Sequence, residues 1–331
     1  MVTSPTALVD RFGRVHTDLR LSLTDRCNLR CAYCMPPAGL EWTRRAELLT
    51  ADEIVRVAAV AVAAGVTKIR LTGGEPLVRP DCVDIVAGLA ELTPRPQIAL
   101  TTNAVLLQDL AQPLAAAGLN RVNLSLDSLD RETYARLTRR DRLPAALAGL
   151  AAAQRAGLAI KINAVLLPGI NDTEAPQLLR FALEQGAEMR FIEHMPLGEA
   201  APWQPDRFIT AAEILDRLRA DFELEPLGRP DAATAERWLV DGGPGVVGVI
   251  ASMSRPFCGD CSRLRLTADG QLRHCLFATT ETNLRAALRS GATAADLLGL
   301  MQTCLNDKSA GHQVGAADFQ KPARGMSQIG G

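Results

Sequence analysis

The strongest constraint on the fold of this chain is a repeated alternation of strand-like and helix-like segments. Six short runs have the apolar or alternating pattern of β-strands: Leu19–Asp25, Lys68–Gly74, Gln97–Asn103, Arg121–Asp127, Ala159–Leu167 and Glu188–Pro196. Between them, apolar residues recur every three to four positions, which is typical of helices: Ala51–Ala64, Asp81–Leu92, Leu106–Ala117, Arg142–Ala156 and Thr173–Gln185. This alternation predicts a parallel sheet with helical crossovers, either doubly wound or closed toward a barrel.

The composition is that of a globular protein and excludes several classes. Of 331 residues, 47% are hydrophobic and 22% charged, and a net charge of −1 gives no bulk attraction to nucleic acid or membranes. No apolar run approaches the roughly 18 residues of a membrane span, and residues 1–20 lack the apolar core of a signal peptide. We therefore predict a cytoplasmic protein, in which eight reduced cysteines indicate metal ligands rather than disulfides.

Unusual polar and glycine residues gather where the predicted strands end. In parallel α/β folds the active site lies at the carboxyl ends of the strands. The residues at these ends are Asp25-Arg26-Cys27, Thr72-Gly73-Gly74-Glu75-Pro76, Thr101-Thr102-Asn103, Ser125-Leu126-Asp127 and His194-Met195-Pro196.

A first cysteine set, Cys27, Cys31 and Cys34, follows the first predicted strand with C-x3-C-x2-C spacing. Thiolates are the soft ligands that iron–sulfur clusters take, and three of them leave one iron of a four-iron cluster open for a small molecule. Structural zinc prefers four protein ligands, and no fourth Cys or His lies near in sequence. The spacing therefore favours a [4Fe-4S] cluster over zinc or three inert thiols.

A second cysteine set, Cys258, Cys261 and Cys275, has C-x2-C-x13-C spacing. Ser262–Leu266 and Gln271–Arg273 flank an Asp-Gly turn and predict a hairpin that folds Cys275 back toward the other two cysteines. A structural zinc completed by His274 or His312 is one interpretation. A second cluster with another open iron is the other, and the lack of a clear fourth ligand favours it.

These motifs carry a family resemblance. The first cysteine set with Tyr33 before its third cysteine, followed by Gly73-Gly74-Glu75-Pro76, resembles the radical S-adenosylmethionine (SAM) superfamily. From DLRLSLTDRCNLRCAYCMP through KIRLTGGEPLVR, RFIEHMP and FCGDCSRLRL to the terminal Gly-Gly, the chain resembles the GTP 3′,8-cyclase family. The resemblance implies an α/β fold, an incomplete (β/α)6 TIM-type barrel in residues 1–240. Residues 241–331 would then form a C-terminal cluster-binding extension.

The resemblance also implies an activity, a lyase reaction in the first step of molybdenum cofactor biosynthesis. Two [4Fe-4S] clusters and SAM would be the cofactors, and a 5′-deoxyadenosyl radical would remove the 3′ hydrogen of GTP before the ribose radical attacks C8. The implied partners are an electron donor of flavodoxin or ferredoxin type and cyclic pyranopterin monophosphate synthase, which receives the product. Neither nucleic acid nor membrane is implied, and a monomer and a homodimer remain open.

Site residues follow from the same resemblance. A triphosphate needs several cations on one side of a pocket, and seven lie in strand or hairpin positions. With Thr101, these match the family's GTP contacts: Arg20, Lys68, Arg70, Lys161, Arg190, Arg263 and Arg265. The matched SAM contacts are Tyr33, Gly74, Ser125 and Met195.

The end of the chain supports two different expectations. Residues from Lys308 onward have few apolar anchors, which predicts a mobile tail. The resemblance instead implies that Gly330 and Gly331 belong to the catalytic site, where only backbone without side chains fits. One position departs from the family, because Ala104 stands where glycine more often follows Thr-Thr-Asn.

Two rival interpretations remain. The first is another two-cluster radical enzyme that modifies a peptide, although such an enzyme need not carry cations within its strands. The second is a non-catalytic barrel with zinc at both cysteine sets.

Overall fold

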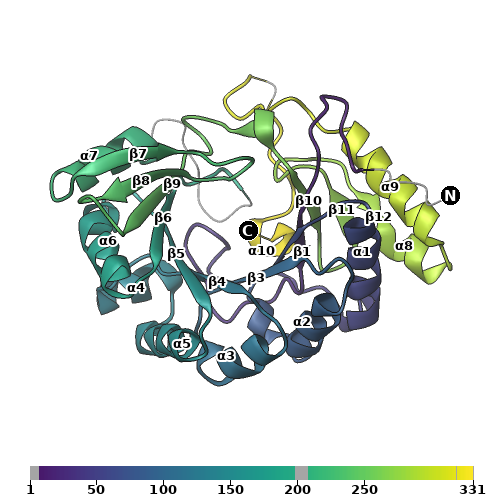
Figure 1. The fold of residues 1–331 in the computed structure, drawn as a ribbon, viewed down its shortest axis with the longest axis horizontal. Coiled ribbons are helices and arrows are strands. Elements are labelled where there is room, and N and C mark those ends of the chain that lie inside the picture. Colours follow the sequence, from purple (N-terminus) through teal and green to yellow (C-terminus); the bar gives the residue numbers. More distant parts are fainter. Residues whose placement is uncertain (1–6, 198–207, 318, 331) are drawn as a thin grey trace.

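The computed structural model describes residues 7–197, 208–317 and 319–330, and its centre is one curved sheet of 12 strands (Figure 1). The strands are β1 (Asp18–Ser22), β2 (Lys68–Thr72), β3 (Gln97–Thr102), β4 (Arg121–Ser125), β5 (Ala159–Val165), β6 (Glu188–Ile192), β7 (Leu224–Gly228), β8 (Glu236–Val240), β9 (Val246–Ile250), β10 (Arg263–Leu266), β11 (Gln271–Arg273) and β12 (Thr282–Asn283). Their order in the sheet is β12-β11-β10-β1-β2-β3-β4-β5-β6-β9-β8-β7.

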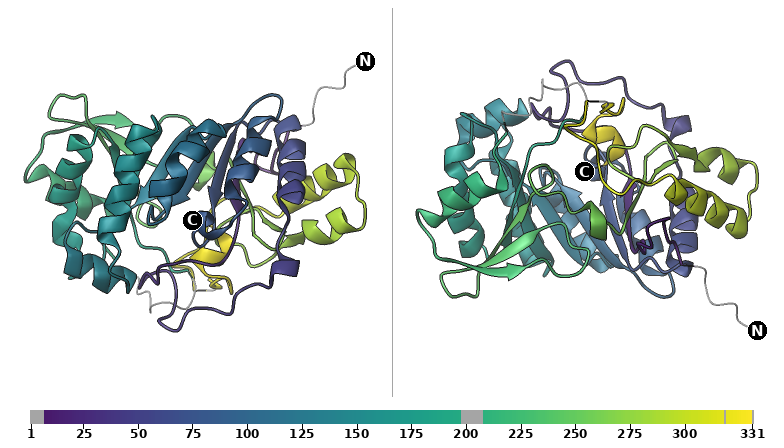
Figure 2. Two further views of the ribbon diagram at one scale, coloured as in Figure 1. Left: turned by 90° about the horizontal axis from the view of Figure 1, so that it is seen from below. Right: turned by 90° about the horizontal axis from the view of Figure 1, so that it is seen from above.

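Helices cover the outer face of this sheet (Figures 1 and 2). The α-helices are α1 (Ala51–Ala63), α2 (Cys82–Ala90), α3 (Leu107–Ala116), α4 (Arg131–Thr138), α5 (Leu143–Arg155), α6 (Ala175–Glu184), α7 (Ala211–Arg219), α8 (Leu284–Arg289), α9 (Ala294–Asn306) and α10 (Met326–Ile329). Short 3-10 turns add Arg45–Glu47, Pro76–Val78, Asp172–Glu174 and Cys258–Asp260.

The six strands β1 to β6 pair in parallel and in chain order, as an incomplete (β/α)6 barrel requires. The sheet continues at both edges, where β10 pairs parallel with β1 and β9 pairs parallel with β6. Among the described residues the edge strands β12 and β7 do not pair with each other, so the barrel is open. The predicted fold class is confirmed, and the division at residue 240 stays a prediction.

Alternation along the strands separates an apolar outer face from a polar interior. In β1, Leu19 and Leu21 are fully buried toward the helices, and Arg20 between them points to the opposite face. Thr50 starts α1 with a capping box that involves Glu53. The hydrophobic core thus lies between the sheet and the helices, and the barrel interior is left for polar chemistry.

The predicted strands were too long at their carboxyl ends. The run Glu188–Pro196 contains β6 only to Ile192, and Leu19–Asp25 contains β1 only to Ser22. The remaining residues form loops at the barrel mouth, where Asp25, for example, accepts a hydrogen bond from the Thr43 N–H at 2.6 Å. The structure also adds α4, α7, β7 and β8, which the sequence did not predict.

The end of the chain returns to the barrel mouth. Helix α10 lies centrally there, beside the loop that follows β1 (Figure 2). Ile329 is fully buried and Ser327 is 1% exposed. The prediction of a mobile tail was wrong for these residues, since buried Ile329, the ion pairs of Arg324 with Asp269 and Glu281, and the hydrogen bond from Arg265 to Gly330 all hold them.

Ala104 has a positive φ of 62° and is fully buried. This is a left-handed conformation that glycine adopts without strain. The loop after β3 therefore keeps a glycine-like backbone despite the alanine. No helix among the described residues is long and apolar enough to cross a membrane.

Candidate active site

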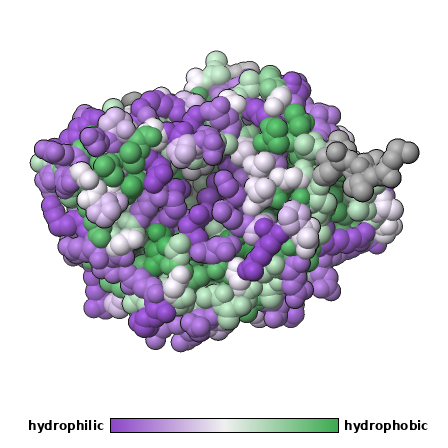
Figure 3. All heavy atoms as spheres, in the orientation of Figure 1, coloured by the Kyte–Doolittle hydropathy of each residue, from purple (hydrophilic) through white to green (hydrophobic). Residues whose placement is uncertain are grey.

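One cavity at the carboxyl ends of the strands brings together most of the predicted site residues. Hydrophilic side chains surround the hollow at the centre of the face seen in Figure 3. The predicted residues that line the cavity are Arg20, Tyr33, Arg70, Thr101, Ser125, Arg190, Met195, Cys258, Cys261, Arg263, Arg265 and Cys275. Asp127, Asn163, His274 and Met326 line it as well.

The loop that carries the first cysteine set is fixed from below by the Gly73-Gly74 segment. The Gly74 N–H donates to the Thr24 carbonyl at 2.8 Å. A Cβ at Gly74 would lie 2.3 Å from the Arg26 carbonyl oxygen, and one at Gly73 would lie 2.3 Å from that of Thr24. Only glycine permits this close approach, so the motif is required for the position of the loop.

Glu75 connects this segment to the next strand end. Its carboxylate accepts hydrogen bonds from the Thr102 hydroxyl at 2.7 Å, the Asn103 N–H at 2.8 Å and the Leu77 N–H at 3.1 Å. Asn103 in turn directs its side-chain amide toward the Cys27 sulfur at 3.8 Å. Burial raises the pKa of Glu75 to about 7. Glu75 belongs to the Gly-Gly-Glu-Pro motif, but the motif did not predict that its carboxylate holds the end of β3, where Asn103 faces Cys27.

The thiols of the first cysteine set are near enough to interact electrostatically, on a loop in which all three cysteines are partly buried. Burial raises the pKa of Cys27 to about 11 and that of Cys34 to about 12, and the pKa of Cys31 rises well above its ordinary value. Such thiols become thiolates when they coordinate a metal, which supplies the missing positive charge. The donor chemistry therefore fits an iron–sulfur cluster. Among the described residues, no three Cys, His, Asp or Glu side chains are arranged around a single metal ion.

Tyr33 is tied to the opposite side of the barrel mouth. Its hydroxyl donates to Asp127 Oδ2 at 2.7 Å, and Asp127 Oδ1 accepts from the Val165 N–H at 2.9 Å. Asn171 donates to the Asp127 carbonyl at 2.8 Å. Sequence reasoning did not predict this link, which orients the side chain that precedes Cys34. Burial raises the pKa of Asp127 from 3.8 to about 6.

We expect Asp127→Asn to remove a pH dependence of stability. Because the pKa is raised in the folded state, the unfolded chain ionises first. The stability contributed by neutral Asp127 is full below pH 3.8 and is lost as the pH rises through about 6. The melting temperature of the wild type should fall relative to that of the variant over this interval. Parallel curves for the two proteins would contradict the expectation.

An arginine row, Arg20, Arg70 and Arg265, crosses the cavity floor. Arg20 is in register with Arg70 on β2 and with Arg265 on β10. Burial and then the charges of the other arginines lower the pKa of Arg20, and the pKa of Arg265 falls to about 10. Within the described residues, Arg20 Nε, Arg70 Nε and Arg263 Nη1 lack a hydrogen-bond partner. Buried donors with excess positive charge indicate an anion-binding site.

The remaining predicted cations are placed differently. Lys161 Nζ and Arg190 Nε both bind the carboxylate of Glu188, at 2.6 and 2.7 Å. Lys68 is exposed at the first residue of β2, one step below Arg70 on the same face, and like Lys161 it does not line the cavity. Their assignment to GTP binding stays a prediction.

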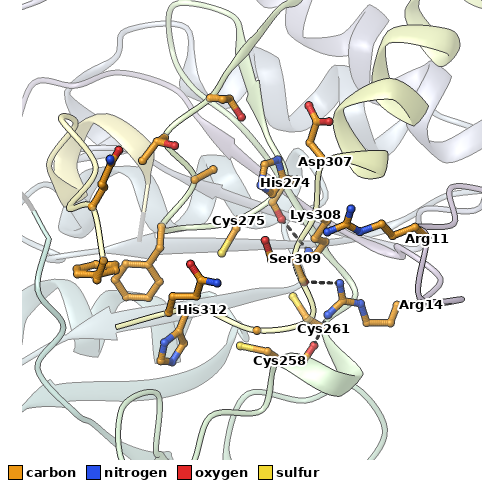
Figure 4. Close-up of a pocket in the computed structure, with 18 residues that line it drawn as sticks. Arg11, Arg14, Cys258, Cys261, His274, Cys275, Asp307, Lys308, Ser309 and His312 are labelled. Atoms are coloured by element: carbon orange, nitrogen blue, oxygen red, sulfur yellow. Dashed lines mark hydrogen bonds between the residues drawn. The ribbon is translucent and has the colours of Figure 1, made fainter. Parts of the chain in front are cut away.

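The second cysteine set lies across the cavity, where Figure 4 shows its sulfur atoms turned toward a common space. Burial raises the pKa of Cys261, but Arg263 and Lys308 outweigh it and lower the value to about 6. His312 uses Nε2 toward the Ser252 carbonyl at 2.8 Å, and Nδ1 accepts from the Val314 N–H at 3.3 Å. With both nitrogens engaged, His312 is a poor fourth ligand for zinc.

Gly330 lies beside Arg265 of the arginine row. Its carbonyl accepts a hydrogen bond from Arg265 Nη1, and its φ is 83°. A Cβ at this position would lie 2.6 Å from Thr72 Cγ2. Gly331, predicted with it as catalytic, lies outside the described residues.

Comparisons with known proteins show the family to which this chain belongs. A family model described as "Radical SAM superfamily" matches residues 21–182, and one described as "Molybdenum Cofactor Synthesis C" matches residues 187–314. The chain therefore has the radical SAM domain that its open barrel and first cysteine set define. It resembles a Streptomyces coelicolor protein named GTP 3′,8-cyclase, with 55% identity over 98% of this chain and 96% of that protein. Proteins of the same name from Rhodococcus opacus and a Mycobacterium species are 53% and 52% identical, each over 98% of this chain and 93% of theirs. The chain belongs to the GTP 3′,8-cyclase family.

Solved structures show the same fold at low sequence identity. Streptococcus suis SuiB bound to S-adenosylmethionine matches with a TM-score of 0.64 and 16% identity, over 88% of this chain and 69% of that one. A second structure, described only as Streptococcus suis SuiB, matches with a TM-score of 0.61 and 15% identity, over 90% of this chain and 68% of that one. The likeness concerns the fold alone.

Proposed function

We propose that this chain converts GTP to 3′,8-cyclo-7,8-dihydro-GTP by radical SAM chemistry, the first step of molybdenum cofactor biosynthesis. The observation that carries the proposal is the arginine row with its unpartnered donors, which lies in the same cavity as Tyr33 and the second cysteine set. Full-length identity to relatives named GTP 3′,8-cyclase supports the choice of substrate.

The first cysteine set holds the cluster that binds SAM. When bound, this cluster and SAM supply a 5′-deoxyadenosyl radical, which is chemistry of the cofactor rather than of the protein. Gly74 lets the backbone approach the loop of the first cysteine set closely, and Tyr33, Ser125 and Met195 line the adjoining cavity wall. The link from Tyr33 to Asp127 keeps this wall in place.

The second cysteine set would hold a second [4Fe-4S] cluster at the wall of the cavity that Cys258, Cys261 and Cys275 line. Its three thiols converge without a clear histidine ligand, and the low pKa of Cys261 favours the thiolate that iron takes. An iron with no protein ligand would then be free to bind the purine of GTP.

The arginine row binds the triphosphate and orients the nucleoside. Guanidinium groups bind phosphate oxygens in pairs, and burial strengthens each contact because water does not compete. Gly330 closes the floor next to Arg265 and excludes water from the region in which a radical must survive.

The partners and the location rest on the family resemblance. An electron donor of flavodoxin or ferredoxin type would reduce the enzyme, and cyclic pyranopterin monophosphate synthase would receive its product. The protein would act in the cytoplasm. A monomer and a homodimer are both compatible with the proposal.

Anaerobic reconstitution with iron and sulfide tests the proposal. The reconstituted protein should hold about eight irons, two four-iron clusters, and form 5′-deoxyadenosine from SAM and dithionite only when GTP is added. If 5′-deoxyadenosine forms equally well without GTP, GTP is not the substrate. Zinc in place of iron would reject the reaction class.

A further inference from the structure

Lys308 connects the two arms of the hairpin that carries the second cysteine set. It follows α9 and is only 3% exposed. Its Nζ donates to the Arg263 carbonyl at 2.9 Å and to the His274 carbonyl at 2.7 Å. Arg263 lies two residues after Cys261, and His274 directly precedes Cys275. One ammonium therefore fixes the separation of two cysteines.

The ammonium also lies near the sulfur atoms of the second cysteine set. Lys308 interacts electrostatically with the thiols of both Cys261 and Cys275. No ion pair joins Lys308 to a carboxylate in the part of the chain that the structure describes. A buried cation without a carboxylate needs another anion, and thiolates with their cluster supply one.

Arg14 holds the remaining cysteine from the other side (Figure 4). Its Nη1 donates to the Cys258 carbonyl at 2.7 Å and to the Ala310 carbonyl at 3.0 Å, and its Nη2 to the Ser309 carbonyl at 2.7 Å. Asp10 orients the guanidinium through Nε at 2.6 Å. The arm with Cys258 is thereby tied to the segment that carries Lys308.

We propose that Lys308 and Arg14 form a cationic clamp that positions the second cysteine set for its iron–sulfur cluster, and that the Lys308 charge raises the reduction potential of that cluster. The clamp rests on the second cluster of the proposed function. Groups that hold metal ligands from outside the coordination sphere set both affinity and potential. Lys308 and Arg14 are positioning residues, because they act on the substrate only through the cysteines.

The test compares wild type with Lys308→Met and with a matched control, Lys321→Met, which removes an exposed lysine from the same C-terminal segment. After reconstitution, iron release to a chelator is followed with time, and each cluster is titrated by electron paramagnetic resonance. Lys308→Met should lose the iron of one cluster about tenfold faster or more. The second cluster that remains in this variant should be reduced only at a more negative potential than in wild type. The Lys321→Met control should match wild type in both iron release and potential.

Arg14→Gln provides an independent second variant. It should also speed iron release, with a smaller change in potential, since Asp10 already balances the charge of Arg14 whereas Lys308 has no carboxylate partner among the residues described. If Lys308→Met does not fold by circular dichroism, Lys308→Gln replaces it with the same expectation. If the wild-type protein holds only about four irons per chain, it has no second cluster, and the proposed function is wrong on this point. If the wild type holds about eight irons and the Lys308 variants keep its rate of iron release and its reduction potential, the clamp alone is wrong.

Discussion

Replacing Arg20 with methionine is expected to weaken GTP binding by about 10- to 100-fold and to stabilise the ligand-free protein. A hydrogen bond to a charged group contributes about 1.5–3 kcal/mol, which sets the loss of affinity. Replacing buried ion pairs with apolar side chains of similar volume stabilises proteins by about 1–4 kcal/mol in known cases, because the cost of desolvating the charges is removed. The same cost applies to Arg20, which is buried, and repulsion from Arg70 and Arg265 adds to it while Asp18 offsets part of it.

Equilibrium binding of GTP and thermal unfolding without ligand measure the two opposite effects. Arg155→Met is the matched control, because Arg155 is exposed at the end of α5 on the outer layer. It should change neither quantity. A variant at Arg20 that loses both affinity and stability would show that this arginine supports the fold rather than the ligand.

Replacing Gly330 with alanine is expected to lower GTP-dependent turnover by about 100-fold while iron content stays unchanged. The added Cβ would lie 2.6 Å from Thr72 Cγ2, so the tail must shift from its contact with Arg265. Displacement of an active-site element by about 1 Å can reduce a rate by that factor.

Gly315→Ala is the matched control for this substitution. Gly315 has a similarly positive φ, 95°, but an added Cβ there would meet nothing within 4 Å. It therefore carries the backbone strain without the collision. Turnover is measured under reconstituted, reducing conditions. Deletion of Gly330 and Gly331 with full turnover would refute a catalytic role for the tail.

Strand–helix alternation predicts the fold class, and the motifs predict the position of the first cysteine set after the first strand. Period-two and period-3.6 patterns are local, so β1 to β6 and five of the helices could be located. The short, polar helix α4 was missed, because its sequence RETYARLT has little apolar periodicity. Its Asp130 cap is a signal that was available.

Which residues line the cavity depends on which strands become neighbours in the sheet. Arg20 and Arg265 are far apart in sequence, and only the parallel pairing of β1 with β10 puts them in register. Lys68 and Arg70 share a face, yet one is exposed at the barrel bottom and the other lines the cavity. Spacing along a strand gives the face of a residue, but not its depth.

What the sequence alone determined is the chemistry of the ligands: three thiols in a short loop, a Gly-Gly approach beneath them, and a second set of three on a hairpin. What only the tertiary structure decided is the surroundings of these groups. The links from Tyr33 to Asp127, from Lys308 to the His274 carbonyl and from Arg265 to Gly330 all join distant segments. Burial and long-range contacts set the charge and position of each group, and neither property is encoded in local residue patterns.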